Sequence, residues 1–366
     1  MTSRREFLAG AMAGSAALFA RNAAAAPQGP KQIKGFCVDF NWGGPKREGW
    51  PNAFAAPGVW ADASPERHVA WYEALGANVI QTFAVSCNGY AWYKDGPVPP
   101  QPGLESDFLT EMVNLGHARN MLVMAYFCAA ANTRWGLEHP DLSYDPISDY
   151  HIPFTDAYLD YLGGAIEDAV RRTGIDGFMI DWLWNPKPEA RKRGWLGSEK
   201  QLFEQLTRGR FPDSGEPAPQ LMLAYERSAL NRCWGRIREA ARGRIVWLSC
   251  NKLTDPSLAG SPVLRECGWV MNEHPDPSYR MAVHKAVGPH TRLVQCVLGW
   301  KEHDTKAFLS APENRHLDIY GFAAPSENSS LPLDISEYLA KAPESFSNVN
   351  DRNIAALARF YRGMKL

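Results

Sequence analysis

Two carboxylic acids stand at the ends of apolar runs, where a folded chain can hold each in one orientation. Asp181 lies near the end of the run GIDGFMIDWLW, residues 174–184, and Glu273 follows an apolar stretch in VMNEHP. A carboxylate placed against aromatic groups can attack an anomeric carbon, and a second, less solvated carboxyl group can donate a proton and later accept one. The pair predicts cleavage of a glycosidic bond, with Asp181 as the nucleophile and Glu273 as the acid. Glu302, in LGWKEHD, is the alternative acid.

Other polar and aromatic residues follow further apolar runs. Flat aromatic rings stack on the apolar faces of sugars, and polar side chains form hydrogen bonds with sugar hydroxyl groups. The chain has thirteen tryptophans, which makes carbohydrate the leading ligand class and an oligosaccharide or glycoside the expected partner. The residues expected to bind it are Asp39, Asn41, Trp42, Asn88, Tyr90, Trp92, Trp182, Trp184, Asn251, Trp300, Glu302 and His303.

Each of these residues also has a purely structural interpretation. Asp181 could cap the next helix or pair with an arginine, Glu273 could form an ion pair with a loop residue, and tryptophans could pack the rim of the fold. The run RKRG, residues 191–194, could contact an acidic glycan, but a solvated loop explains it better.

No metal ion or cofactor is expected. The three histidines closest to the expected site, His139, His274 and His303, do not have the i, i+4 spacing of a helical metal pair. The seven cysteines form no CxxC pair and no Cys/His cluster with zinc-ligand spacing. Most of them lie in apolar runs, where cysteine acts as a small buried residue.

The elements that must position these residues alternate along the chain. Strand-length apolar runs cover residues 33–41, 79–88, 122–129, 177–184, 245–251, 269–273, 293–300 and 319–324. Segments of helical period cover residues 64–75, 104–119, 154–172, 223–242, 278–287, 305–309 and 335–341. Alternating strands and helices indicate right-handed parallel units, and eight such units predict an α/β fold, a closed (β/α)₈ TIM barrel. Its catalytic groups stand at the carboxyl ends of the strands.

The N-terminal segment has the pattern of an export signal. Ser3-Arg4-Arg5-Glu6-Phe7-Leu8 precedes a short apolar run and small residues suited to cleavage. This pattern predicts a twin-arginine signal peptide over residues 1–26, followed by a single catalytic domain over residues 27–366. Because that route exports folded proteins, the expected location is the periplasm or the exterior, reached without any need for disulfides.

Composition excludes several classes of protein. A formal charge of −1 and 45% hydrophobic residues are typical of a well-packed enzyme. The chain is not basic enough for a nucleic-acid partner, and no long apolar window follows the signal, so no membrane partner is expected after its removal. Composition leaves the oligomeric state open.

One block of the chain resembles a known family. YLDYLGGAIEDAVRRTGIDGFMIDWLW, residues 158–184, is similar to the segment of α-L-fucosidase-type glycoside hydrolases that leads into the nucleophilic aspartate, which falls on Asp181. WYEALGANVIQTFAVSCNGYAWY, residues 71–93, resembles the unit before a fucose-binding loop. Residues 86–88 are Ser-Cys-Asn where that family has His-His-Asp, so the resemblance does not set the sugar.

Two arrangements of the carboxylates are open. A nucleophile on the fourth strand with an acid on the sixth is the layout of the α-galactosidase and α-glucosidase clan, which the pair Asp181 and Glu273 resembles. The large clan with its acid on the fourth strand and nucleophile on the seventh would instead assign those roles to Asp181 and Glu302. Its acid is normally a glutamate after asparagine, so this version ranks lower.

Three hypotheses compete. A retaining hydrolase requires carboxyl groups roughly 5–5.5 Å apart, whereas a gap of roughly 6.5–9.5 Å would indicate inversion. A barrel that binds carbohydrate without cleaving it is the alternative from another class. A metal-dependent deacetylase or lyase would need converging histidine and carboxylate ligands, which the spacing does not indicate.

Overall fold

The structure, a computed structural model, describes residues 29–366 except 46, 148–149, 250–251 and 300–303. Residues 31–366 form one compact unit. The expected signal peptide, residues 1–26, lies outside the described residues, as do Asn251, Trp300, Glu302 and His303.

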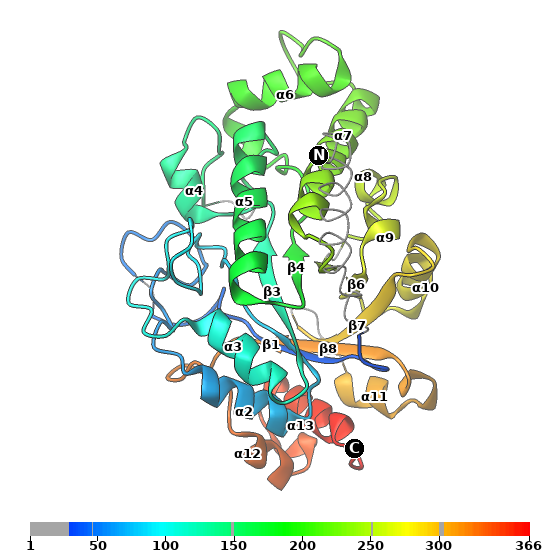
Figure 1. The fold of residues 1–366 in the computed structure, drawn as a ribbon. Helices are drawn as coiled ribbons and strands as arrows, with labels where there is room; N and C mark the ends of the chain where they lie inside the picture. The colour runs from blue at the N-terminus through cyan, green and yellow to red at the C-terminus, as the bar shows by residue number, and fades with distance from the viewer. Residues whose placement is uncertain (1–28, 46, 148–149, 250–251, 300–303) are drawn as a thin grey trace, which may run out of the picture. The chain divides into compact units, whose positions relative to one another are not determined.

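Eight parallel strands form a closed barrel in sequence order, which confirms the predicted fold (Figure 1). Each predicted strand is present, and most are shorter at their carboxyl ends than the apolar runs suggested. The bounds are β1 Lys34–Val38, β2 Val79–Gln81, β3 Leu122–Cys128, β4 Gly177–Asp181, β5 Ile245–Ser249, β6 Trp269–Asn272, β7 Arg292–Leu298 and β8 Asp318–Ala323. Pairing of β1 with β8 closes the sheet.

Helices follow the strands as a (β/α)₈ fold requires. The predicted helices correspond to α2 Pro65–Leu75, α3 Phe108–His117, α5 Asp156–Thr173, α7 Pro219–Ala240, α10 Pro277–Ala286, α11 Thr305–Ser310 and α12 Ile335–Ala340. The structure adds α4 Thr133–Glu138, α6 Gly197–Thr207, α8 Pro256–Ala259, α9 Val263–Glu266 and α13 Val349–Tyr361. Three short 3₁₀ turns lie at Ala190–Arg193, Pro312–Asn314 and Pro343–Ser345. No helix in the described part of the chain is long and apolar enough to cross a membrane.

Two helices differ in how they begin. Ser64 caps α2, because its side chain accepts the backbone N–H of Arg67. Helix α3 was expected from residue 104 but begins after Asp107, whose side chain makes no capping bond. The Asp107 carboxylate instead accepts the backbone N–H of Lys94, 3.4 Å away, and so ties the preceding loop to the helix.

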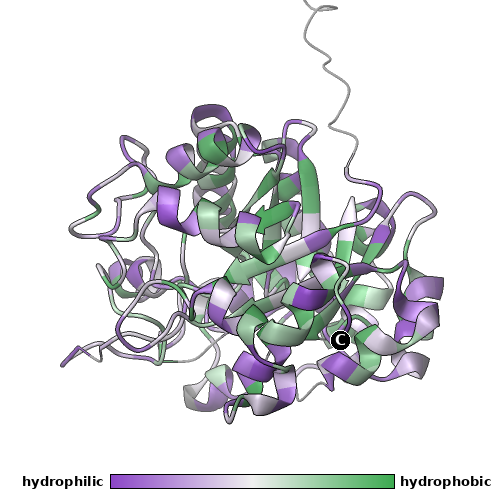
Figure 2. Ribbon diagram, turned by 90° about the horizontal axis from the view of Figure 1, so that it is seen from below, coloured by the Kyte–Doolittle hydropathy of each residue, from purple (hydrophilic) through white to green (hydrophobic). Residues whose placement is uncertain are grey.

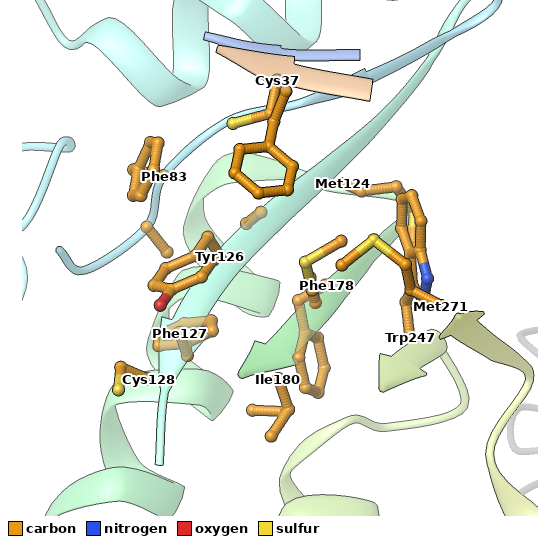
Figure 3. Packing of buried hydrophobic residues seen from close by; sticks show 14 of the residues in the cluster. Cys37, Phe83, Met124, Tyr126, Phe127, Cys128, Phe178, Ile180, Trp247 and Met271 are labelled. Carbon is orange, nitrogen blue, oxygen red and sulfur yellow. The ribbon is translucent and has the colours of Figure 1, made fainter. Parts of the chain in front are cut away.

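Side chains that point into the barrel pack in layers. The inner faces of β5, β6 and β8 contribute Trp247, Trp269 and Tyr320, whose rings make edge contacts with centroids 5.0–5.3 Å apart. Figure 3 shows Tyr126 of β3 in the same buried cluster as Trp247, and the ring of Tyr126 lies 4.9 Å from that of Phe83. Side chains therefore fill the interior of the barrel, so a reaction can take place only at an end of the barrel.

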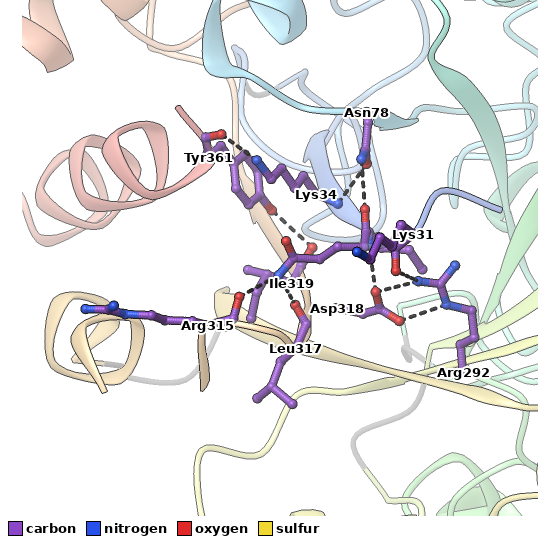
Figure 4. A network of polar contacts seen from close by, with 11 residues as sticks. Lys31, Lys34, Asn78, Arg292, Arg315, Leu317, Asp318, Ile319 and Tyr361 are labelled. Atoms are coloured by element: carbon purple, nitrogen blue, oxygen red, sulfur yellow. Dashed lines mark hydrogen bonds and ion pairs between the residues drawn. The ribbon is translucent and has the colours of Figure 1, made fainter. Parts of the chain in front are cut away.

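The amino-terminal end of the barrel is held by polar contacts around the β8–β1 seam (Figure 4). Asp318 receives two bonds from Arg292 and one from the backbone N–H of Ile33 at 2.7 Å. Helix α13 closes the seam from outside, because Lys34 donates to the carbonyl of Tyr361, whose hydroxyl donates to backbone carbonyls of β1 and β8. In Figure 2 the strands are mainly hydrophobic, and hydrophilic residues lie along the surrounding helices. The loops that follow the strands lie at the opposite, carboxyl end of the barrel.

Candidate active site

Four polar side chains converge at the carboxyl end of the barrel. Asp181 is the last residue of β4 and pairs in register with Ser249, the last residue of β5. Asp39 directly follows β1, and Glu273 directly follows β6. Side chains alternate along a strand, so residues two positions after the inward-facing Cys37, Met179, Trp247 and Met271 also face inward. The fold thus brings together Asp39, Asp181 and Glu273, which lie far apart in the sequence.

Asp181 is held by bonds to both carboxylate oxygens. The hydroxyl of Tyr126 donates to Oδ2 at 2.9 Å, and the backbone N–H of Trp182 donates to Oδ1 at 2.9 Å. Burial raises the pKa of Asp181 to about 6, although hydrogen bonds from Tyr126, Trp182 and Ser249 oppose the increase. The carboxylate is therefore ionised at neutral pH and fixed in orientation, as a nucleophile requires.

Asp39 is a second carboxyl group with a raised pKa. Burial raises its pKa to about 7; the backbone N–H of Asn41, 2.9 Å from Oδ1, lowers it, and the charge of Asp181 raises it. At neutral pH the Asp39 carboxyl is therefore about half protonated. It can act as either a donor or an acceptor toward a sugar hydroxyl.

Ser249 connects Asp181 with Glu273. Its hydroxyl donates to Glu273 Oε1 at 3.2 Å, and Ser249 also pairs in register with Asp181 and lowers the pKa of that carboxyl group. One hydroxyl group therefore lies beside both residues predicted to be catalytic.

Trp182 has an unusual backbone conformation. Its φ of 50° lies in the left-handed region, where a bulky residue is strained by about 1–3 kcal/mol. The backbone N–H of the same residue donates to the Asp181 carboxylate. The indole is clamped between Phe54, with centroids 5.5 Å apart, and Tyr150, with centroids 4.8 Å apart. Ring packing thus fixes the indole directly beside the Asp181 carboxylate.

Aromatic rings extend to both sides of Trp182. Phe54 contacts Trp42 at 5.1 Å, and Tyr150 contacts Trp184 at 5.2 Å. The three tryptophans are partly exposed, whereas Phe54 and Tyr150 are buried behind them. The arc from Trp42 to Trp184 therefore offers indole surface beside Asp181, as sugar stacking requires.

Three of the expected substrate-binding residues hold loops instead. Trp92 is 1% exposed, stacks on Phe40 and donates from Nε1 to Ser86, so its prediction as a substrate contact is wrong. Asn41 is buried and accepts the backbone N–H of Cys87, and buried Asn88 bonds to its own loop. Strand β2 ends at Gln81, so residues 82–93 fold back onto the barrel rather than ending at its mouth.

Tyr90 differs from its neighbours in that loop. Its ring is partly exposed, and the guanidinium of Arg134 lies 5.8 Å from the ring centroid. Tyr90 thus keeps a surface on which a ligand could stack.

Two residues of the site were missed by sequence reasoning as functional residues. Tyr126 lies two positions before the end of β3, inside an apolar run, and only the alternation of side chains could have marked it as inward-facing. Ser249 stands at a predicted strand end, but its role depends on Glu273, twenty-four residues later. Both residues act through partners that only the closed barrel brings near.

The segment RKRG was expected to be a solvated loop, but it is only partly solvated. Arg191 is buried and forms an ion pair with Glu199, which is 0% exposed. Tyr144 and Tyr225 also donate to Glu199, which joins the loop after β4 to α6, α7 and the segment before α5. This cluster anchors the loop that carries Trp184, and Arg191 is not available to a glycan.

Among the described residues, no three His, Cys, Asp or Glu side chains are grouped so that they could hold a metal ion. Of the histidines considered as ligands, His139 bonds to the carbonyl of Trp135 and His274 stacks on Tyr279. The six described cysteines are buried and free.

The fold aligns with solved structures of glycoside hydrolases. α-L-Fucosidase isoenzyme 2 from Paenibacillus thiaminolyticus shares 15% identity with a TM-score of 0.61, over 91% of this chain and 49% of that protein, so this chain spans about half its length. A β-N-acetylhexosaminidase shares 11% identity (TM-score 0.51, 89% of this chain and 71% of that one). A glycoside hydrolase family 20 β-N-acetylglucosaminidase shares 12% (TM-score 0.50, 90% and 69%). No protein-family model and no curated protein matches the sequence. The chain has the (β/α)₈-barrel fold of these glycoside hydrolases.

Proposed function

We propose that this chain is an exported glycoside hydrolase that cleaves a glycosidic bond with retention of configuration. The observation that carries the proposal is the link from Asp181 through Ser249 to Glu273 at the carboxyl end of the barrel. The position of Ser249 beside both carboxyl groups supports a close pair, and retention requires a separation of roughly 5–5.5 Å, against roughly 6.5–9.5 Å for inversion.

The reaction uses the two carboxyl groups in turn. Asp181 attacks the anomeric carbon while Glu273 gives its proton to the departing glycosidic oxygen, so the carbon–oxygen bond breaks as the ester to Asp181 forms. Glu273 then takes a proton from water, whose oxygen attacks the same carbon and releases Asp181. The pKa of Asp181, about 6, supports the first step because the attacking group is ionised above that pH.

Substrate contacts come from the surroundings of Asp181. Trp42, Trp182 and Trp184 present partly exposed indoles that suit the apolar face of a sugar ring. Asp39 is placed to bind a sugar hydroxyl, and Tyr90 offers a further ring. An α-L-fucoside is the first substrate to test, because residues 158–184 resemble the corresponding segment of fucosidases, whereas residues 86–88 depart from the fucose-binding pattern.

Hydrolysis of a panel of aryl α- and β-glycosides, α-L-fucoside included, tests this proposal with the wild type and Asp181→Asn side by side. The matched control is Asp176→Asn, the same change at the opposite end of β4, where Asp176 binds His117 and the backbone of Val123. Turnover lost in Asp181→Asn and kept in Asp176→Asn is the expected result. Proton NMR of the first-formed product reports whether configuration is retained.

A panel that stays silent with folded wild-type protein would contradict catalysis on simple glycosides. Calorimetry with oligosaccharides would then test the alternative, a barrel that only binds. In that case Trp184→Ala would abolish binding and Asp181→Asn would leave it intact.

Export is a separate part of the proposal. The motif from Ser3 to Leu8 supports transport of the folded protein by the twin-arginine route to the periplasm or beyond. Replacing both Arg4 and Arg5 with lysine should retain the protein in the cytoplasm, as cell fractionation would show. Release of both forms alike would contradict this route.

A further inference from the structure

A single hydroxyl group lies between the two carboxyl groups of the site. Ser249 is 2% exposed, pairs in register with Asp181 across β4 and β5, and donates to Glu273 Oε1 at 3.2 Å. Its hydroxyl has one proton and two lone pairs, so it can donate to only one carboxylate at a time while accepting from the other. The hydroxyl is therefore placed where it can reach either carboxyl group.

We infer that Ser249 is a positioning residue that donates its hydroxyl proton to Asp181 in the first half of the reaction and to Glu273 in the second. The inference rests on the proposed function and adds to it a residue that couples the two carboxyl groups. No covalent bond to Ser249 forms or breaks, and only the direction of its O–H changes.

The charge of each carboxyl group changes in the course of the reaction. Before attack, Glu273 carries the proton and Asp181 is ionised, so Glu273 can donate to the Ser249 oxygen while Ser249 donates to Asp181. Once Asp181 is esterified it is neutral, and Glu273 has lost its proton to the leaving group. The Ser249 hydroxyl is then drawn to the Glu273 carboxylate, because hydrogen bonds to ionised groups are stronger. In each half of the reaction, the Ser249 hydroxyl thus stabilises whichever carboxylate is ionised.

Other ionisable groups face the same pair. Tyr126 donates to Asp181, and the charge of Asp181 reaches Cys87 and Asp39, raising the pKa of each. On the other side, the charge of Glu273 contributes to the raised pKa of Cys296 on β7. Burial keeps both thiols protonated, so among these neighbours Asp39 is the group that titrates near neutral pH together with the pair.

Infrared titration tests the inference without requiring turnover. The carboxyl band of protonated Asp181 is the band lost in Asp181→Asn, and its midpoint is followed against pH. Ser249→Ala should move this midpoint upward by about one pH unit, since a hydrogen bond to the charged form is lost. Ser249→Thr keeps the hydroxyl and should restore the wild-type midpoint. Ser336→Ala, which removes a serine bonded to Asp334 at the start of α12, is the control.

The second half of the reaction has its own test. Asp181→Asn replaces the nucleophile with a neutral group, as esterification does, and the Glu273 band is identified by its loss in Glu273→Gln. In the Asp181→Asn background, adding Ser249→Ala should also raise the midpoint of Glu273 by about one pH unit.

The outcomes separate the two proposals. An unchanged Asp181 midpoint in Ser249→Ala, or an unchanged Glu273 midpoint in the double variant, overturns the inference whatever the activity. Both shifts in a protein that hydrolyses no glycoside support the coupling and contradict the proposed function. With an active enzyme, the acid limb of kcat/KM should move with the Asp181 midpoint in Ser249→Ala and not in Ser249→Thr.

Discussion

Tyr126 of β3 and Asp181 of β4 are joined side chain to side chain, with 2.9 Å between the phenolic oxygen and Oδ2. Burial raises the pKa of Tyr126, so the phenol stays protonated and acts as the donor. The bond exists because Cys128 pairs with Asp181 in the register of the two strands, which places Tyr126 one inward-facing position below. The orientation of Asp181 is thus built into the pairing of the sheet.

Removing that hydroxyl should weaken Asp181 in its proposed role as nucleophile. Tyr126→Phe leaves the ring packed against Phe83 but removes a hydrogen bond to a charged group, a loss of about 1.5–3 kcal/mol. We expect kcat/KM to fall about 10- to 100-fold and its acid limb to move above pH 6. Tyr158→Phe is the control, because the buried hydroxyl of Tyr158 has no hydrogen-bond partner in the described part of the chain. Equal losses in both variants would contradict a specific role for Tyr126.

Asp39 should destabilise the folded protein at high pH. Its pKa rises from 3.8 in the unfolded chain to about 7 in the folded one, so its contribution is fully favourable below pH 3.8 and is lost as pH rises through 7. Asp39→Asn keeps a neutral group at every pH. Urea unfolding should find this variant more stable than the wild type by about 2–4 kcal/mol at pH 8, and not at pH 4. A pH-independent difference would contradict the raised pKa.

Two buried histidines should destabilise the folded protein at low pH, whereas Asp39 does so at high pH. Burial lowers the pKa of His68 and His151 to about 3, so both are neutral in the folded protein. Their stabilisation is fully present above the unfolded pKa of 6.5 and is lost as pH falls toward 3. His151→Gln should reduce the slope of unfolding free energy against pH between 6 and 4 by about 1.4 kcal/mol per pH unit. His284→Gln, an exposed position on α10, should leave that slope unchanged.

The buried pair of Arg191 and Glu199 should matter far more than an exposed pair. Glu199→Ala leaves the Arg191 guanidinium buried without its carboxylate, which typically destabilises a protein by about 3–5 kcal/mol. Asp213→Ala breaks the exposed pair with Arg210, and its effect should stay below about 1 kcal/mol. Thermal unfolding measures both. Hydrogen exchange should rise around residues 185–197 in Glu199→Ala, since this pair anchors that loop, and similar exchange in both variants would contradict the anchoring.

The sequence predicts the parts of this molecule that depend on local pattern. Apolar runs and alternation were sufficient for the eight strands, the barrel and the position of Asp181 at the end of β4. Helical period also located α2 to within one residue, but it placed the start of α3 at residue 104, four residues before Phe108.

The parts that depend on pairing between distant segments could not be predicted in this way. An apolar run does not show where its partner strand stops, so β2 was predicted to reach residue 88 although pairing ends at Gln81. That difference alone moves Trp92 from the expected site into the core. The contacts of Tyr126 and Ser249 depend likewise on register across neighbouring strands.

The left-handed backbone of Trp182 has an evolutionary consequence. Glycine and asparagine adopt this conformation with less strain, so random substitution favours them at position 182 unless an indole there is being selected. A descendant that no longer used Asp181 would have no reason to keep a strained tryptophan beside it. With Asp181 in its proposed role, the residue at this position should therefore distinguish lineages that keep the activity from lineages that have lost it.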